Sequence, residues 1–471
     1  MDATNIFIVG IKGAAMCHIA VILKKMGKQV GGCDVADQFI TDEVLTQNGI
    51  VPDIGFDTKN LTSQVDLVVY SAAHGGTDNP VVVAAKNTGV AVMSQAELLG
   101  ELLTQFNITI AVCGTHGKTT TTSLLTYAFM KLGSSPSYLI GSSNFTADGK
   151  TYPGGDYQGR DYFVIEADEY GVNPPLDKTP KFQLLKPTHI IALNVDFDHP
   201  DVYANLEEVK QAFTTFFEEG KAKITYCADD AVLADVATSL PALTTTSFGL
   251  SEQSKYRISN IRVEETHTLF SLTSYDESIT DIALSLYGEK NVSNAAGVIV
   301  CLLDLGFTPD EIKRAIAGFT GPKRRLELKF ENKDTYLFDD YAHHPAEIEA
   351  TIAALRARFP GHRLVTIFQP HTFSRTATLV NEFSKALSGS DLVYVMPIFA
   401  SAREATGNQT VSSGDIVSKL TDQVIGHSIA NQAQLSTSLK ADIHAKDIVV
   451  TMGAGDVYKL SDAIIELIKA V

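Results

Sequence analysis

The 471-residue chain contains no tryptophan and only five cysteines. These cysteines, Cys17, Cys33, Cys113, Cys227 and Cys301, are odd in number, far apart and never arranged as a CxxC pair. Such spacing argues against a disulfide framework and against a zinc ribbon. It is typical of a protein whose thiols stay reduced.

Positive charge is scarce as well, because 38 Lys and Arg residues face 55 Asp and Glu residues, for a net charge of −17. That balance disfavours nonspecific binding to nucleic acid or to an anionic membrane, although a local basic pocket stays possible. No apolar run reaches the roughly 18–20 residues that a membrane helix needs. The start MDATNIFIVG shows no charged region or cleavage site of a signal peptide. We therefore expect a cytoplasmic protein without nucleic-acid or membrane partners.

Internal repeats, low-complexity stretches and long linkers are also missing. The length predicts two to four domains, at about 100–200 residues each. Apolar runs with β-branched residues alternate with helical periodicity, a pattern that favours parallel sheets covered by helices. We predict an α/β protein of three domains: residues 1–107, 108–320 and 321–471.

Specific elements support this division. In the first block we predict strands at Asn5–Val9, Gln29–Cys33 and Val65–Tyr70, and a helix at Ala14–Met26. In the other two blocks, we predict strands at Ile108–Val112, Tyr162–Ile165, His189–Leu193, Tyr336–Phe338, Arg363–Phe368, Asp391–Met396 and Asp447–Thr451, a β-meander over Thr266–Thr280, and helices over 119–133, Asn205–Glu219 and Ala346–Phe359.

The strongest motif is Gly114-Thr115-His116-Gly117-Lys118-Thr119, which lies between the apolar ITIAVC and a helix. A glycine turn lets backbone N–H groups approach a polyphosphate, and the helix N-terminus adds a favourable dipole. Lys118 would bridge the β- and γ-phosphates, and Thr119 would place a hydroxyl on Mg²⁺. The motif is shorter than GxxxxGK[ST], since Val112 occupies the first glycine position. We favour phosphate binding over a glycine turn with an exposed lysine.

Acidic residues follow two other strands. Glu166, Asp168 and Glu169 come directly after YFVI, and Glu166 is the best candidate for a Mg²⁺ ligand because it immediately follows the strand. His199 lies in NVDFDH after the strand HIIAL and would ligate a second metal or polarise a phosphate. Taken singly, each acidic loop or histidine is more often a solvated or capping feature.

Basic and polar clusters recur at strand ends of the last block. They are Lys323-Arg324-Arg325, His343-His344, and His371 with Arg375. Each alone is more often a solvated surface, but together they predict a cationic pocket for anionic substrates. At the N-terminus, Gly10-Ile-Lys-Gly13-Ala-Ala15 is only a partial dinucleotide fingerprint. Asp34 is well placed to bind a ribose hydroxyl, which makes a nucleotide diphosphate plausible here. The incomplete glycine pattern gives NAD only weak support.

The order of these motifs resembles the Mur ligases of peptidoglycan synthesis, and within them the branch that adds L-alanine to UDP-N-acetylmuramate. The matching segments span the chain: GIKGAAM, SAAHGGTDNP, CGTHGKTTTT, EADEY, NVDFDHPDVY, GEKNVSNAAG, GPKRRLE, DDYAHHPAEIEATI, FQPHTFSRT and MGAGDVYKL. The resemblance implies an ATP-dependent amide ligase. It also implies an N-terminal Rossmann-like domain for the UDP-sugar, a central P-loop domain for ATP, and a C-terminal Rossmann-like domain for the amino acid.

The resemblance also assigns roles to residues. The ATP site would comprise Gly114, Thr115, His116, Gly117, Lys118, Thr119, Thr120, Asn291, Arg325 and Asp340. Mg²⁺ would be held by Thr119, Glu166 and His199. Substrates would contact Gly10, Gly13, Asp34, Ser71, His344, His371 and Arg375. Among these residues, Lys118 and Arg325 would offset charge in the transition state, and His344 would help to deprotonate the amine.

Some residues depart from the family pattern and leave alternatives open. Lys12 and Ala15 stand where the family usually has glycine, and Lys290 stands where a GxHN pattern has histidine. EADEYGVNPPLDKTPKF is more similar to a related branch that attaches a recycled tripeptide. A phosphate-transferring P-loop ATPase or kinase, a non-catalytic nucleotide-binding regulator and an NAD oxidoreductase are the rivals from other classes. Either a monomer or a homodimer is compatible with the sequence.

Overall fold

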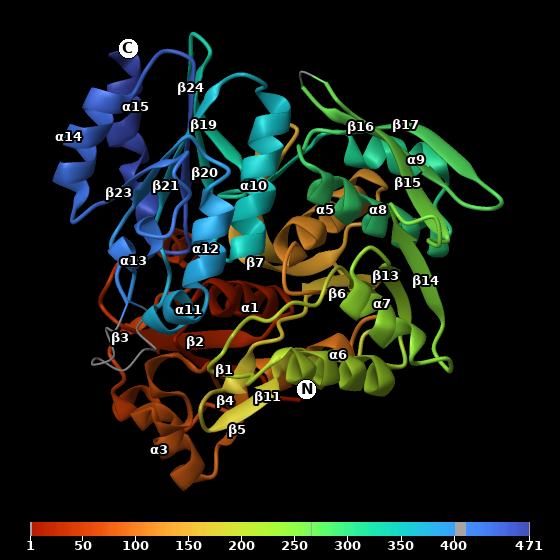
Figure 1. Ribbon diagram of the computed structural model, residues 1–471. Helices are drawn as coiled ribbons and strands as arrows, with labels where there is room; N and C mark the ends of the chain where they lie inside the picture. The colour runs from red at the N-terminus through yellow and green to blue at the C-terminus, as the bar shows by residue number, and fades with distance from the viewer. Residues whose placement is uncertain (1, 265, 401–410, 471) are drawn as a thin grey trace. The chain divides into compact units, whose positions relative to one another are not determined.

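The computed structural model describes residues 2–264, 266–400 and 411–470. The chain forms two compact units, which we describe separately. Unit 1 comprises Met1–Ile261, Leu269–Ser285 and Ser293–Thr320, and unit 2 comprises Arg262–Thr268, Leu286–Val292 and Gly321–Val471. Figure 1 shows the helices and strands of both units.

The N-terminal part of unit 1 is a five-stranded parallel sheet in the order β3-β2-β1-β4-β5. The strands NIFIV and LVVY in the middle of this sheet are apolar runs because both of their faces are buried. The predicted first-block elements are confirmed, with small shifts at their ends. The strands are β1 (Asn5–Val9), β2 (Gln29–Asp34), β3 (Asp53–Ile54), β4 (Leu67–Tyr70) and β5 (Ala91–Ser94); the helices are α1 (Ala14–Lys25), α2 (Thr41–Gln47), α3 (Pro80–Thr88) and α4 (Gln95–Leu103).

The rest of unit 1 is built on an eleven-stranded sheet. Its order is β17-β16-β15-β14-β13-β12-β6-β9-β7-β18, with β8 antiparallel to β7. The predicted strands are confirmed. Strands are also present where the meander was predicted over Thr266–Thr280, but the three neighbouring strands β15, β16 and β17 begin earlier, at Tyr256, and end later, at Leu284. The strands are β6 (Ile108–Cys113), β7 (Ser137–Ala147), β8 (Lys150–Asp156), β9 (Tyr162–Glu166), β12 (His189–Ala192), β13 (Lys223–Cys227), β14 (Thr245–Gly249), β15 (Tyr256–Val263), β16 (Thr268–Thr273), β17 (Ser278–Leu284) and β18 (Phe319–Pro322).

Helices of this part include α5 (Lys118–Lys131), α6 (Leu206–Gly220), α7 (Ala231–Thr238), α8 (Glu289–Asp304) and α9 (Pro309–Ile316). The first residues of α8, up to Val292, belong to unit 2. A separate hairpin is formed by β10 (Gly171–Asn173) and β11 (Asp177–Pro180).

Helix α5 is buried although its first half is rich in threonine. Its hydroxyls donate to carbonyl oxygens one turn back, from Thr121 to Gly117, from Thr122 to Lys118 and from Ser123 to Thr119, at 2.6–2.9 Å. Because these hydroxyls form hydrogen bonds within the helix, burying them costs little free energy. The helix that begins at the glycine turn therefore packs inside the unit.

Helix α1 joins the two sheets of unit 1. The buried His18 lies against the β7–β8 hairpin: its Nε2 accepts from the Gly154 N–H at 3.2 Å, and its Nδ1 donates to the Ala14 carbonyl at 2.7 Å. Burial lowers the pKa of His18, which favours the neutral ring that this pattern requires. A Cβ on Gly155 would lie 2.7 Å from the His18 Cβ, so this contact needs glycine in the strand.

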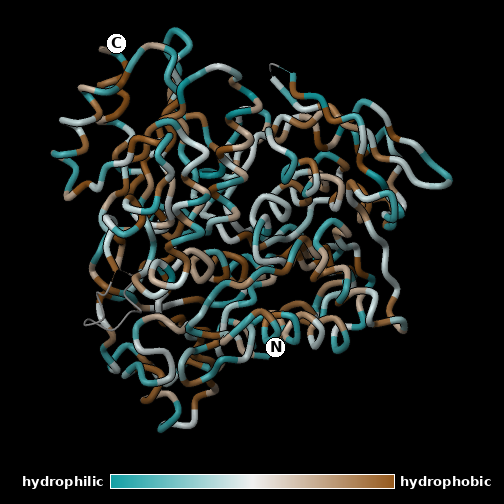
Figure 2. Tube along the Cα trace, viewed as in Figure 1, coloured by the Kyte–Doolittle hydropathy of each residue, from teal (hydrophilic) through white to brown (hydrophobic). Residues whose placement is uncertain are grey.

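Unit 2 contains a six-stranded sheet in the order β19-β20-β24-β21-β22-β23, in which the β19–β20 pair alone is antiparallel. Hydrophobic clusters pack on its two faces, and apolar residues concentrate along its central strands (Figure 2). The predicted strands and helix of this block are confirmed. The elements are β19 (Glu327–Asn332), β20 (Thr335–Asp340), β21 (Arg363–Phe368), β22 (Leu392–Val395), β23 (Ile425–Ser428), β24 (Asp447–Met452), α10 (Pro345–Arg358), α11 (Phe373–Thr378), α12 (Val380–Leu387), α13 (Ser413–Val417), α14 (Gln432–Asp442) and α15 (Ser461–Lys469).

Within the described residues, no helix has both the length and the apolar character to cross a membrane. The five cysteines are free thiols, and all are buried. Burial raises the pKa of Cys17 and Cys33 to about 12, which keeps these groups protonated and unreactive.

Candidate active site

The glycine turn Gly114–Gly117 connects β6 to α5. Gly117 has φ +85°, and a Cβ there would lie 2.8 Å from Asn294 Oδ1, so the position requires glycine for two reasons. The turn ends at the N-terminus of a 14-residue helix. Unsatisfied backbone N–H groups at that end, together with the helix dipole, suit a phosphate.

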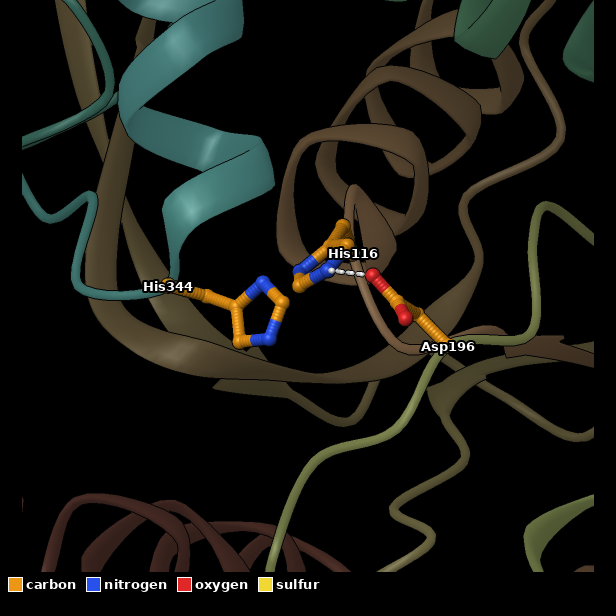
Figure 3. Close-up of side chains that lie close together, drawn as sticks. All are labelled: His116, Asp196 and His344. Atoms are coloured by element: carbon orange, nitrogen blue, oxygen red, sulfur yellow. Dashed lines mark ion pairs between the residues drawn. The ribbon is translucent and has the colours of Figure 1, made fainter. Parts of the chain in front are cut away.

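The end of the neighbouring strand β12 shapes this turn. Asn194 accepts from the His116 N–H at 2.7 Å and donates to the His116 carbonyl at 3.0 Å. Thr115 Oγ1 accepts from the Asp196 N–H at 2.8 Å, and the His116 ring lies 3.7 Å from the Asp196 carboxylate (Figure 3). Sequence reasoning assigned no role to Asn194. The sequence offered a weak signal, a polar residue at the end of a parallel strand next to β6.

Lys118 is folded back over the turn. Its Nζ lies 2.7 and 3.0 Å from the two Glu169 carboxylate oxygens and donates to the carbonyls of Gly114 and Thr115 at 2.6 and 3.1 Å. Burial by itself would lower the pKa of Lys118, but Glu169, Glu166 and Asp168 outweigh it and raise that pKa. The site therefore holds a charged ammonium beside the glycine turn, hydrogen-bonded to Glu169 and to two carbonyls of the turn.

Glu166 is the last residue of β9 and faces the first turn of α5. Its Oε1 accepts from Thr119 Oγ1 at 3.2 Å, and its Oε2 accepts from the Gly141 N–H at 2.8 Å. A hydroxyl and a carboxylate at this separation form a hard oxygen donor set, the type that Mg²⁺ prefers. The predicted convergence of Lys118, Thr119 and Glu166 is thus present in the fold.

His199 lies on the other side of Glu169. Its Nε2 is 3.6 Å from Glu169 Oε1 and 3.7 Å from Asp198 Oδ2. Burial opposes protonation of the ring, but Asp198 and Glu169 together raise the pKa of His199. Asp168 points elsewhere, since it forms an ion pair with Lys181 at 2.8 Å. Of the three clustered acids, Glu166 and Glu169 therefore face the glycine turn.

A second polar cluster surrounds the turn after β1. The Lys12 N–H donates to Asp34 Oδ2 at 2.7 Å, and His74 Nε2 lies 3.3 Å from Asp34 Oδ1. A Cβ on Gly10 would lie 3.4 Å from the His74 ring and 3.5 Å from Ser71 Oγ, so all these groups meet. Gly13 directly precedes α1 as its N-cap. Nothing in the sequence indicates that His74 pairs with Asp34, because Asp34 lies at the end of a different strand, β2.

The unexpected Lys12 has a structural role. Its amino group donates to the carbonyls of Val35 and Asp37 at 3.0 and 2.9 Å and lies 3.3 Å from the Asp42 carboxylate. The side chain thus secures the 35–42 segment, and only the backbone of Lys12 faces Asp34.

Unit 2 carries the remaining predicted residues. Asp340, at the end of β20, accepts from the N–H groups of Leu326 and Ala342 and from Thr351 Oγ1 at 2.9–3.0 Å. Its burial outweighs the opposing effect of the Arg325 charge and raises its pKa to about 6. Arg325 lies 3.3 Å from Glu347 Oε1. Asp340 therefore organises the segment that carries Arg325.

His344 is the N-cap of α10, where its Nδ1 accepts from the Ala346 N–H at 3.4 Å. His371 stacks on Phe399 with ring centroids 5.6 Å apart, and the His343 ring lies 6.2 Å away. Arg375 is buried in α11, and Asn291 donates to the Tyr287 carbonyl at 2.8 Å in the first turn of α8. Within unit 2, the fold thus brings the predicted His343-His344 pair close to His371.

Comparison with known proteins identifies three family domains in the chain. Residues 5–107 match the Mur ligase family catalytic domain, residues 112–302 the Mur ligase middle domain, and residues 324–455 the Mur ligase glutamate ligase domain.

Full-length relatives share these domains. A UDP-N-acetylmuramate–L-alanine ligase of Desulfitobacterium hafniense is 32% identical and covers 98% of this chain and 99% of its own. The enzyme of that name from Levilactobacillus brevis is 36% identical, with 99% and 98% covered.

Two solved structures share the fold over 99% of each chain. The UDP-N-acetylmuramate–alanine ligase of Thermotoga maritima gives a TM-score of 0.78 at 24% identity. A murein peptide ligase of Psychrobacter arcticus gives 0.70 at 25%.

Proposed function

The chain belongs to the Mur ligase family and is an ATP-dependent amide ligase, and we propose that it joins L-alanine to the carboxylate of UDP-N-acetylmuramate in peptidoglycan precursor synthesis. The observation that carries the proposal is the arrangement at the glycine turn. A charged lysine, a helix N-terminus and a hydroxyl–carboxylate pair face one place, as transfer of a phosphoryl group requires.

The first chemical step forms an acyl phosphate. A carboxylate oxygen of the sugar attacks the γ-phosphorus of ATP, an O–P bond forms, and the bond to the leaving ADP oxygen breaks. Both reacting oxygens are anionic, so the cation of Lys118 and the N–H groups of the turn stabilise the transferring group. Lys118 gives up its contacts with Glu169 and the loop carbonyls to do so.

The second step forms the amide. The amine nitrogen attacks the acyl carbon, and the C–O bond to phosphate then breaks and releases inorganic phosphate. The amine must lose its proton, and we assign assistance in that step to His344. Arg325 would offset phosphate charge, Asn291 and Asp340 would contact the nucleotide, and His371 and Arg375 would bind substrate. The reaction has to exclude water from the acyl phosphate.

Thr119, Glu166 and His199 would hold Mg²⁺. The Thr119 hydroxyl and the Glu166 carboxylate fit this ion as hard oxygen donors at one edge of the sheet. Bound there, Mg²⁺ would offset the charge of the phosphate oxygens. In the N-terminal sheet, Gly10, Gly13, Asp34 and Ser71 would contact the uridine diphosphate.

Phosphate release tests the proposal. The protein is incubated with UDP-N-acetylmuramate, ATP and magnesium, and with L-alanine, L-serine, glycine or a tripeptide as the amine. We expect release with L-alanine and none without an amine. ADP formation that needs no amine would instead indicate a phosphate-transferring ATPase, if phosphate is released with it, or a kinase, if it is not. Neither ADP nor phosphate with any amine would favour a regulator. Transfer of ¹⁸O from labelled carboxylate to phosphate would verify the acyl phosphate.

A second candidate is a ligase that attaches a recycled tripeptide to the same sugar nucleotide. It is favoured by the 166–182 segment and by the likeness to a murein peptide ligase. Activity with the tripeptide alone would select this candidate.

A further inference from the structure

The loop Ala73–Asp78, which follows β4, is held by a residue from the β10–β11 hairpin (yellow in Figure 1). Asn173, a buried residue, donates through Nδ2 to Thr77 Oγ1 at 3.2 Å. Gly76 passes so close that a Cβ there would lie 2.2 Å from Asn173 Oδ1, and its φ of +52° also favours glycine. The loop and Asn173 thus fit each other tightly.

The other side of the loop carries His74. Its backbone is left-handed at φ +55°, and its carbonyl accepts from Asn79 Nδ2 at 2.9 Å. This conformation directs the imidazole toward Asp34, at 3.3 Å, and places the ring beside the Gly10 turn. About a third of the His74 side chain is exposed, so a ligand at that turn can reach it.

The base of the hairpin is anchored at the phosphate-binding turn. Within residues 166–173, Glu166 contacts Thr119, Glu169 pairs with Lys118, and Asn173 contacts the Ala73–Asp78 loop. The ion pair between Asp168 and Lys181 joins the two strands of the hairpin at their base. One short segment therefore touches both the ATP turn and the loop that carries His74.

We propose that Asn173 is a positioning residue for the sugar nucleotide: it holds Gly76 and Thr77 so that His74, supported by Asp34, binds the diphosphate at the Gly10 turn. The geometry leaves one ring nitrogen of His74 facing Asp34 and the other for a phosphate oxygen, which a diphosphate ligand supplies. The inference rests on the proposed function and specifies how the UDP moiety is recognised.

Calorimetric titration of the full chain with UDP, and separately with UDP-N-acetylmuramate, tests the inference. Asn173→Ala is expected to raise the dissociation constant of UDP about tenfold, and His74→Ala at least as much. The KM of UDP-N-acetylmuramate should rise in parallel, while the KM of ATP stays within about twofold. Because Asn173 acts through His74, the double variant should bind UDP no more weakly than His74→Ala alone.

Variants of Thr77 and of an exposed asparagine complete the design. Thr77→Ala removes the acceptor of Asn173 and should weaken UDP binding, whereas Thr77→Ser keeps the hydroxyl and should bind as wild type. These two variants decide the question if Asn173→Ala does not fold. Asn87→Ala, on the exposed side of α3, is the matched control and should change nothing.

Two results would overturn the inference. One is unchanged UDP affinity in folded Asn173→Ala or Thr77→Ala. The other is an additive loss in the double variant, which would mean that Asn173 does not act through His74. If the wild-type protein itself binds neither UDP nor UDP-N-acetylmuramate, the proposed function fails instead.

Discussion

Lys118 and Glu169 form a largely buried ion pair, with 12% and 3% of their side chains exposed and Nζ 2.7 Å from Oε2. The pair keeps the lysine charged and oriented before any nucleotide arrives. A buried carboxylate left without its cation is costly, so Lys118 contributes to the folded structure as well as to phosphate binding. The two contributions can be separated by mutation.

Replacing Lys118 by Ala should lower turnover by at least about 100-fold, because one cationic donor to the transferring phosphoryl group is lost. UDP binding should persist, since the Gly10 turn lies apart from this lysine. Steady-state kinetics and calorimetry with UDP measure the two effects. Equal loss of both in a folded variant would contradict the assignment.

Lys118→Ala should also lower the free energy of unfolding, by up to about 3–5 kcal/mol, because the buried Glu169 loses its lysine partner and is left with His199, 3.6 Å away. The double variant Lys118→Ala/Glu169→Gln removes that charge and should recover most of the stability but none of the activity. Urea denaturation of both variants provides the comparison. If the double variant is no more stable than the single one, the carboxylate is not the cause.

Asn194→Ala should weaken ATP binding, because the variant loses both side-chain hydrogen bonds that fix the His116 backbone. We expect the KM of ATP to rise about tenfold, consistent with two lost hydrogen bonds of about 0.5–1.5 kcal/mol each. Asn194→Asp keeps the acceptor but not the donor, so its KM for ATP should lie between those of the wild type and Asn194→Ala. The UDP dissociation constant should not change in either variant, and a change there would point to a general loss of structure.

Asp340 makes the stability of the protein depend on pH. Its folded pKa of about 6 exceeds the ordinary 3.8, so between pH about 4 and 6 the folded state binds more protons than the unfolded state. Stability therefore falls as the pH rises through this window and then levels off, by about 1–3 kcal/mol in total. Asp340→Asn should lack this component, so its stability relative to wild type should increase from pH 4 to 6.

Denaturant unfolding of the full chain at several pH values from 4 to 8 checks this expectation. The exposed Asp334 provides the control, and Asp334→Asn should follow the wild-type profile. Parallel profiles for wild type and Asp340→Asn would show that the carboxyl does not titrate in this window.

The five thiols should resist modification in the native protein. All are buried, and burial raises the pKa of the Cys113, Cys301 and Cys227 thiols as well as those of Cys17 and Cys33. At pH 8 we expect a thiol reagent to label five groups in denaturant and close to none in buffer. Rapid labelling of one group in the native protein would show that its site opens readily.

The strands were predictable because their apolar runs are short and end in polar residues, and the approach of Lys118, Thr119 and Glu166 followed from parallel strands ending at one edge. The loops between them were less predictable. Asp168 and Glu169 are neighbours of the same charge, yet one pairs with Lys181 and the other with Lys118. Loop residues have no fixed period, so sequence could not show which acid faces the turn.

Contacts between residues far apart in the chain could not be predicted from the sequence either. His74 and Asp34 are 40 residues apart, and Asn173 meets Thr77 across 96 residues. Lys12 departs from the family pattern, and the sequence could not show that its side chain secures the 35–42 segment. The boundaries after residues 107 and 320, the metal ligands and the substrate residues stay predictions.

The contact between His18 and Gly154 bears on how the protein can be divided for study. The family domains meet between residues 107 and 112, which invites expression of separate fragments there. Cutting at that point would break the hydrogen bond between His18 and Gly154. It would expose the buried His18 ring on one fragment and the Gly154 backbone on the other. Truncations for crystallisation or NMR should therefore retain residues 2–322, up to the end of β18, as one piece.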